Sequence, residues 1–392
     1  MRHKFINYKH SFFIIFAFLF SQSYFLSLAQ SSSVQKKDSQ FELLFENKTN
    51  NPPFKVEIIA KDLGIPWGMV FLNEKELLWT EKQGKVKKIN LETKKISPIS
   101  LSIKNLYYHG QGGLLDVALH PNFKQNQWVY FSYGLSVGKK QTTALGRAKL
   151  KGNKMTSFKT LFLAQDDYNS NRHFGSRMQF DDKGFLFITI GDRAKKKEAQ
   201  NLSSHLGKLL RLDENGKAVK DNPFFNTKGA KPEIYSYGHR NPQGLFIHPE
   251  TKEIYLQEHG PRGGDEINLI KKGRNYGWPV ITHGRAYSGL KIGEGTHKKG
   301  MEQPIKYWVP SIAPSSLLIY SGKKFPNWLG NFFSSSLVLT HLNRLQIQNN
   351  KVIKEDRLLS NLDFRFRHVI EGPKGFLYLS VDQGMILKLS PL

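Results

Sequence analysis

The sequence predicts an all-β protein, a six-bladed β-propeller with about four antiparallel strands in each blade. First, a unit of two apolar strands joined by a polar turn recurs six times between residues 68 and 380. Second, further apolar runs lie between the copies, as a blade of about four strands requires. Third, no long amphipathic helix is evident, although residues 199–210 suit a short one. A pair of β-sandwiches is the alternative, and it explains the regular unit less well.

The six copies share an apolar strand, a turn with Pro, Asp, Asn or Gly, and a second apolar strand. They span residues 68–72 with 77–80, 116–121 with 128–131, 177–181 with 185–189, 244–249 with 254–256, 316–320 with 332–335, and 367–371 with 376–380. Additional strands are expected at 85–89 and 385–389. A strand that begins near Val56 is expected to join the last blade and close the ring.

The propeller domain is expected to span residues 54–392. Ahead of it, basic residues in the first nine positions precede an apolar run at 11–20 and small residues at 27–29. This order is typical of a signal peptide over residues 1–29, so we expect secretion across the inner membrane into the periplasm. An uncleaved anchor is the alternative, but the apolar run is short for a membrane span, and no transmembrane domain is expected in the mature chain.

Residues 30–53 are rich in Ser, Lys, Gln and Asn and end in two prolines, which indicates a linker. Residues 41–45 suit a short strand within it. The chain of 392 residues is 39% hydrophobic, so it can bury a sizeable core. It contains no Cys, which excludes disulfides, thiolate nucleophiles and Cys-based zinc sites.

The formal net charge is +26, and it falls to about +23 if the three basic residues of the signal peptide, Arg2, Lys4 and Lys9, are removed. Such a charge suits nucleic acid, an anionic surface or an anionic ligand. The lysines are spread along the chain, and no nucleic-acid-binding module is recognisable. We therefore expect a generally basic surface and no nucleic acid partner.

Unusual polar residues fall at a shared position, just before or at the first strand of a copy. Equivalent positions in successive blades lie on one face around the propeller axis, so these side chains are expected to converge on one cleft. They are Gln111, His173, Arg240, Asn241, Arg365 and Arg367.

A loop rich in glycine follows the strand at 253–256. Gly260, Gly263 and Gly264 permit backbone angles that other residues resist, and Asp265 and Glu266 add carboxylate oxygens. Carbonyl and carboxylate oxygens suit a hard cation such as Ca²⁺. From composition alone, a polar turn with solvated acids is the simpler explanation.

Residues 258–268 and 275–279 closely resemble the calcium and cofactor loop of the soluble sugar dehydrogenases that use pyrroloquinoline quinone (PQQ), the aldose sugar or glucose/sorbosone dehydrogenase family. The similarity recurs in matching order from about Gly64 to the C-terminus. It is carried by Gly110-Gln111-Gly112-Gly113-Leu114-Leu115, by the segment from Asn171 to Arg177, and by Tyr237-Gly238-His239-Arg240-Asn241-Pro242-Gln243-Gly244-Leu245.

The resemblance implies a dehydrogenase that oxidises aldose sugars at C1 to lactones by hydride transfer to PQQ. It implies that His173 is the general base and that Arg240 stabilises negative charge on the quinone. It assigns PQQ contacts to Gln111, Arg240, Asn241, Arg365 and Arg367. It also assigns one Ca²⁺ to the carbonyls of Gly260 and Pro261 and a second, structural Ca²⁺ to Glu266 and Tyr276. Electrons would pass to a carrier that the sequence does not identify.

The chain departs from the family pattern at three places. Asn343 stands where the family often has a Lys that contacts PQQ, and the neighbouring Arg344 is expected to be able to substitute for it. Arg172 stands where an acidic residue often precedes the catalytic His. Residues 285–310 differ most and are expected to shape the substrate entrance.

Two other functions stay open at this point. A calcium-dependent propeller lactonase would need the metal but no PQQ, and a sugar- or partner-binding propeller with a decayed cofactor site would need neither. The remaining histidines of these segments, His120, His248 and His259, are expected to be structural.

Overall fold

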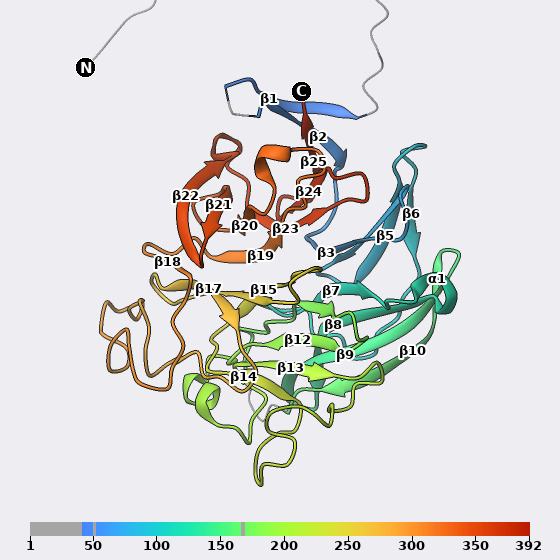
Figure 1. The fold of residues 1–392 in the computed structure, drawn as a ribbon. Coiled ribbons are helices and arrows are strands. Elements are labelled where there is room, and N and C mark those ends of the chain that lie inside the picture. The colour runs from blue at the N-terminus through green and yellow to red at the C-terminus, as the bar shows by residue number, and fades with distance from the viewer. Residues whose placement is uncertain (1–40, 50–51, 166–168) are drawn as a thin grey trace, which may run out of the picture. The chain divides into compact units, whose positions relative to one another are not determined.

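The computed structural model describes residues 41–49, 52–165 and 169–392, and the predicted signal peptide lies outside these ranges. Six antiparallel sheets form the blades of a propeller, which confirms the predicted fold (Figure 1). Among the described residues, helix is confined to the short α1 (Phe123–Asn126) and to the 3₁₀ turns η1 (Lys196–Gln200), η2 (Pro326–Trp328) and η3 (Ser360–Leu362). None of these is long enough to cross a membrane.

The first five blades each contain four strands in chain order. The first blade contains β3 (Pro66–Phe71), β4 (Glu76–Glu81), β5 (Lys85–Asn90) and β6 (Ile96–Ile99). The second contains β7 (Leu114–Leu119), β8 (Trp128–Val137), β9 (Lys140–Lys151) and β10 (Lys154–Leu163). The third contains β11 (Met178–Phe180), β12 (Leu186–Ile190), β13 (Lys208–Leu212) and β14 (Ile234–Tyr237). The fourth contains β15 (Pro242–Ile247), β16 (Ile254–Glu258), β17 (Asp265–Ile270) and β18 (Lys306–Trp308). The fifth contains β19 (Pro314–Ile319), β20 (Phe332–Ser336), β21 (Leu342–Gln348) and β22 (Lys351–Leu358).

The sixth blade is built from both ends of the described chain. Its strands are β23 (Phe366–Glu371), β24 (Leu377–Val381), β25 (Met385–Pro391), β2 (Phe54–Ala60) and β1 (Glu42–Asn47). β2 pairs antiparallel with β25, with Phe54 opposite Pro391, and the Phe54 side chain is fully buried. The ring therefore closes as predicted, and β1 is the short strand expected within residues 30–53.

The first two strands of every blade coincide with the predicted repeat. Most residues of these strands are buried because blades pack face to face, and β12 is accordingly a nearly continuous apolar run. The short helix predicted at 199–210 is wrong. η1 ends at Gln200, and the apolar run from Lys208 forms the fully buried strand β13 instead. Burial between two blades overrides the local helical preference of this segment.

At the propeller axis, the buried guanidinium of Arg177 contacts the first strands of four other blades. It donates to the Asp116 carboxylate at 2.9 Å, to the Gln243 carbonyl at 3.0 Å and to the Ser315 carbonyl at 2.8 Å. Its guanidinium carbon lies 4.2 Å from the centre of the Trp67 ring. A buried charge needs such partners, and here they come from separate blades.

One rim of the propeller carries two kinds of loop, those that lead into the first strand of a blade and those that follow its second strand. Loops that lead into first strands end there, and antiparallel pairing brings the end of each second strand to the same edge. In the fourth blade, for example, Pro242 at the start of β15 lies opposite Glu258 at the end of β16. The loop around Gly260 therefore reaches the face on which the predicted polar residues converge.

Candidate active site

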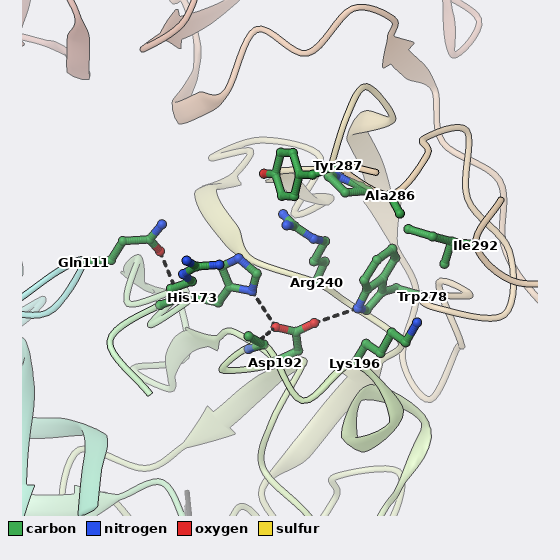
Figure 2. Close-up of a pocket in the computed structure, with 12 residues that line it drawn as sticks. Gln111, His173, Asp192, Lys196, Arg240, Trp278, Ala286, Tyr287 and Ile292 are labelled. Carbon is green, nitrogen blue, oxygen red and sulfur yellow. Dashed lines mark hydrogen bonds and ion pairs between the residues drawn. The ribbon is translucent and has the colours of Figure 1, made fainter. Parts of the chain in front are cut away.

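A cavity of about 540 Å³ opens on this rim. Of the residues predicted from sequence, Gln111, His173, Arg240 and Pro261 line it (Figure 2). They come from three different blades, as the argument from equivalent blade positions requires. The structure therefore brings these four together within a volume suited to a small ligand.

His173 and Asp192 form a buried pair in the wall of this cavity. The His173 Nδ1 lies 2.6 Å from the Asp192 Oδ1 (Figure 2). Asp192 also accepts the Ala194 backbone N–H at 2.8 Å and the Trp278 indole N–H at 2.7 Å. Because an ionised carboxylate can only accept, His173 donates from Nδ1, which leaves its Nε2 unprotonated and able to accept a proton.

The backbone around His173 is held in an uncommon conformation. His173 has a φ of 53°, in the left-handed region, and its N–H donates to the Gln111 side-chain oxygen at 2.7 Å. Two residues on, the Gly175 N–H donates to the Asn241 side-chain oxygen at 3.2 Å. Opposite, a Cβ on Gly191 would lie 2.1 Å from the His173 carbonyl oxygen, so only glycine fits there. Gln111 and Asn241 thus position the imidazole.

The electrostatic surroundings keep His173 neutral. Burial lowers the pKa of its imidazole, the hydrogen bond to Asp192 opposes this shift, and the Arg240 charge lowers the pKa further. The net pKa lies below the usual value of about 6.5. A neutral imidazole with an unprotonated Nε2 facing a cavity is the arrangement of a general base at neutral pH.

Arg240 lies beside this pair and is held by the glycine-rich loop. Its backbone N–H donates to Glu258 at 2.6 Å, and its Nη1 donates to the carbonyls of Gly260 at 2.7 Å and His259 at 3.1 Å. Its guanidinium also lies 5.5 Å from the Trp278 ring. No described residue accepts from its other guanidinium nitrogens, so these remain available to a ligand that carries negative charge.

The glycine-rich loop is packed too tightly for side chains at its turn. A Cβ on Gly260 would lie 2.2 Å from the Gly263 carbonyl oxygen, and Gly263 and Gly264 both have positive φ values. Asp265 accepts the Gly260 N–H at 2.7 Å and the backbone N–H of Ile312 at 2.7 Å. The suggestion that the Asp265 carboxylate faces a cation is therefore wrong, because its oxygens hold this loop.

Glu258 and Glu266 lie directly opposite each other on β16 and β17, beside a second cavity of about 10 Å³. Burial and the Glu258 charge raise the pKa of Glu266 to about 8, and the Asn268 amide, which donates to both carboxylates, opposes the shift. A space of one water-sized sphere between oxygen donors fits a single hard cation, whose charge would relieve this repulsion.

Tyr276 lines the same small cavity, but its phenol points elsewhere. The hydroxyl donates to the Leu269 carbonyl at 2.8 Å and accepts the Lys271 N–H at 2.8 Å. A contribution to a metal would come from its carbonyl oxygen. The described residues contain no cluster of three His, Cys, Asp or Glu side chains able to hold a metal, so carbonyls are needed here.

Arg365 and Arg367 share one acid and do not line the larger cavity. Both donate to Asp382, from Arg367 at 2.8 and 2.9 Å and from Arg365 at 3.2 Å. Burial would raise the pKa of Asp382, but the two guanidiniums outweigh it and lower the pKa. The Arg367 Nη1 also contacts the Gln243 side chain at 3.4 Å, and Gln243 in turn contacts His259.

Neither Asn343 nor Arg344 replaces the family lysine. The Asn343 amide donates to Glu355 at 2.9 Å, and Arg344 pairs with Asp356 and lies 5.2 Å from the Trp328 ring. Both side chains are thus engaged by β22 or the fifth-blade core, away from the cavity. The expectation that Arg344 can substitute for the lysine is wrong.

The three histidines expected to be structural have protein partners. His120 contacts Glu214 at 2.9 Å, and His248 accepts backbone N–H groups in the turn after β15. His259 is buried and contacts Gln243, and burial together with the Arg240 charge lowers its pKa well below the usual value. None of the three lines the larger cavity.

The sequence profile of the Glucose / Sorbosone dehydrogenase family matches residues 63–388, most of the chain. This chain belongs to the glucose/sorbosone dehydrogenase family. It is 40% identical to the aldose sugar dehydrogenase YliI of Escherichia coli K12 over 86% of this chain and 92% of that protein. It is 27% identical to quinoprotein glucose dehydrogenase B of Acinetobacter calcoaceticus over 93% of this chain and 92% of the relative.

Solved structures of the glucose/sorbosone dehydrogenase family have the same propeller. The apo-form of the soluble aldose sugar dehydrogenase from Escherichia coli superposes with a TM-score of 0.83, at 40% identity over 86% of this chain and all of that one. The PQQ-bound aldose sugar dehydrogenase of Streptomyces coelicolor, at 23% identity and a TM-score of 0.71, shows the shared fold alone. The protein thus has the fold of the PQQ-type quinoproteins.

Proposed function

We propose that the protein is a PQQ- and Ca²⁺-dependent dehydrogenase that oxidises aldose sugars at C1 to lactones. The observation that carries this proposal is the His173–Asp192 pair, 2.6 Å apart, in the wall of a basic cavity. Relatives named as sugar dehydrogenases, at 40% identity, support the substrate class.

His173 is the general base of the proposed reaction. Its Nε2 accepts the proton of the C1 hydroxyl, and Asp192 stabilises the imidazolium that forms. Bound PQQ supplies a two-electron acceptor for the hydride that leaves C1. Loss of one proton and one hydride converts the cyclic hemiacetal into a lactone. Arg240 contributes fixed positive charge on the acceptor side of the site.

The lining of the larger cavity fits a planar tricarboxylate. Arg240 keeps N–H donors available for carboxylate or quinone oxygens, Gln111 lines the same cavity, and Trp278 offers an aromatic face. The family resemblance adds Asn241, Arg365 and Arg367 as cofactor contacts, although none of these three lines the cavity.

Calcium has oxygen donors at both proposed positions. The Gly260 carbonyl has a second lone pair besides the one that accepts from Arg240, and Pro261 lines the larger cavity. Glu266 and the Tyr276 carbonyl lie at the smaller cavity beside Glu258. All of these are the hard oxygen ligands that Ca²⁺ prefers.

The test is dye-linked oxidation of a panel of aldoses by the purified protein, with PQQ and Ca²⁺ each present or omitted. We expect turnover only with both additions and its loss in His173→Ala. His248→Ala, which removes an imidazole that only caps a turn, is the matched control and should keep activity.

Absence of turnover and of PQQ binding would overturn the dehydrogenase proposal. Hydrolysis of lactones with Ca²⁺ alone would then indicate the lactonase alternative. Binding of a sugar without either reaction would indicate a binding propeller.

Export of the protein is a separate proposal, supported by the pattern of residues 1–29, which lie outside the described ranges. N-terminal sequencing of protein from a periplasmic fraction is the test. A mature chain that begins near residue 30 is expected, and an intact N-terminus in the cytoplasmic fraction would contradict it.

A further inference from the structure

Two cations of the larger cavity have no part in the proposed reaction. Arg172 and Lys196 both line the cavity, both are exposed, and neither forms an ion pair with a described residue. The one acid of this lining, Asp192, is buried and already accepts from His173, Ala194 and Trp278. Among the described residues of the lining, no carboxylate is therefore left to neutralise the two cations.

The backbone at Arg172 is held by hydrogen bonds to buried residues. The buried Arg193 donates to the Arg172 carbonyl at 2.8 Å, and its guanidinium lies 3.5 Å from the Phe174 ring. Next along the chain, the His173 N–H is held by Gln111. The Cα of Arg172 is thus held in place next to His173, the proposed base.

The turn that carries Lys196 is anchored in a similar way. The buried Lys208 ammonium donates to the carbonyls of Glu198 at 2.8 Å, Ala199 at 3.1 Å and Leu206 at 2.6 Å. At the start of the turn, the Lys195 N–H donates to the Asp192 carbonyl at 2.7 Å. Lys196 lies beside Trp278, on the other side of the view from Gln111 (Figure 2).

These cations differ from the three arginines assigned to the cofactor, of which Arg365 is exposed but paired with Asp382 and the other two lie deeper. Arg240 and Arg367 are buried, whereas Arg172 and Lys196 are exposed residues of the cavity lining. Two cations in the lining of one cavity make its potential positive, and an anionic ligand compensates this charge. A neutral sugar would offer no such compensation.

We propose that Arg172 and Lys196 form an anion-recognition subsite and that the substrate is an aldose carrying a carboxylate or a phosphate away from C1. This inference rests on the proposed function for its reaction but not for its binding. The C1 hydroxyl lies at His173, and the anionic group of the sugar lies between the two cations. A sugar acid and a sugar phosphate share this chemistry, and the experiment separates them.

The experiment compares kcat/KM for D-glucuronate, D-glucose 6-phosphate and D-glucose in the protein loaded with PQQ and Ca²⁺. We expect at least one anionic sugar to exceed D-glucose about tenfold, and the ratio to fall as salt is added. Arg172→Gln and Lys196→Gln should each lower the ratio of anionic to neutral sugar about fivefold. Lys197→Gln removes a charge from the same turn but not from the cavity, and should leave the ratio unchanged.

A binding measurement separates this inference from the reaction. Calorimetry without PQQ, where no turnover occurs, should show that the protein binds the preferred anionic sugar more tightly than D-glucose and that Arg172→Gln weakens this binding. If no sugar is oxidised but this binding difference is found, the subsite stands and the proposed reaction fails.

Three results would overturn the proposal. Preference for D-glucose in both turnover and binding would do so, as would equal effects of Lys197→Gln and Lys196→Gln on the ratio. A fall in PQQ affinity in Arg172→Gln and Lys196→Gln, with an unchanged ratio, would assign the two cations to the cofactor instead.

Discussion

The Asp192→Asn variant tests whether the carboxylate beside His173 serves the reaction. The present Asp192 accepts three N–H groups, from His173, Ala194 and Trp278. An amide that faces His173 and Ala194 with its oxygen turns its NH₂ group toward the Trp278 indole N–H, and two donors then face each other. The flipped amide presents NH₂ to His173 and moves the imidazole proton to Nε2, which removes the base.

Either orientation also removes the negative charge beside the imidazolium that forms. A hydrogen bond to a charged group contributes about 1.5–3 kcal/mol. Because about 1.4 kcal/mol corresponds to a factor of ten in rate, kcat should fall about 10- to 150-fold. The hydrogen bond and charge of Asp192 raise the pKa of His173 against the lowering by burial, so their loss should lower that pKa further.

The assay is dye-linked kinetics as a function of pH with saturating PQQ and Ca²⁺. In the wild type, the acid limb of kcat/KM should lie below pH 6.5, because the base must be unprotonated and its pKa is lowered. In Asp192→Asn the residual activity should show this limb at still lower pH. Asp213→Asn, in a turn after β13 where the carboxylate accepts only backbone N–H groups, should behave as wild type. A folded Asp192→Asn protein within about threefold of wild type, with an unmoved limb, would refute the reasoning.

Three further outcomes are expected. Arg177→Met leaves the Asp116 charge buried without its partner, so the free energy of unfolding in urea should fall by about 3–5 kcal/mol, and a loss below about 1 kcal/mol would contradict the axial role. Removal of calcium with EGTA should lower the melting temperature of the wild type more than that of Glu266→Gln, since a ligand bound only by the folded state stabilises it, and equal shifts would argue against a metal at Glu266. Of the described strands, a chain that begins at Pro52 lacks only the outermost β1, and it should melt a few degrees lower. A chain that begins at Leu63 also lacks β2 with the buried Phe54 and should fail to fold, as circular dichroism would show.

The inner half of each blade could be predicted from the sequence because its strands are buried on both faces. β12 and β20, for example, are wholly buried and are continuous runs of apolar or small residues, and the same holds for the middle of β4 between its terminal glutamates. Outer strands such as β10 and β22 carry mostly partly buried or exposed residues and have no comparable signal. The misjudged segment from residue 199 to 210 shows the same limit, since only packing between blades makes it a strand.

Part of the candidate site was predicted from one topological rule, that polar residues just before the first strands of the blades converge on one face. Gln111, His173 and Arg240 precede first strands and meet at the cavity. Asp192, by contrast, follows the second strand of the third blade, just as the Gly260 loop follows that of the fourth. Antiparallel pairing brings both kinds of position to one rim, so a search of the residues after second strands would have found Asp192.

The same rule accounts for the partner of the sixth-blade arginines, whose contacts with a cofactor stay a prediction. Asp382 follows the second strand of the sixth blade, and its carboxylate accepts hydrogen bonds from both Arg365 and Arg367. Trp278 could not be found by position at all, because it lies in the long connection between β17 and β18, 86 residues after the Asp192 that it contacts.

The closure of the sixth blade also determines when the propeller can finish folding, because one pair of strands can form only at the end of synthesis. β2 is among the first folded segments to be synthesised, yet its partner β25 is the last strand of the chain. The two ends must meet across almost the whole sequence, which is a contact of high sequence separation and therefore slow to form. Until then β2 offers an unpaired edge that other chains can bind. Joining β25 to β2 by a linker and opening the chain between two other blades would make this pairing local, and such a rearranged chain should fold faster with an unchanged cavity.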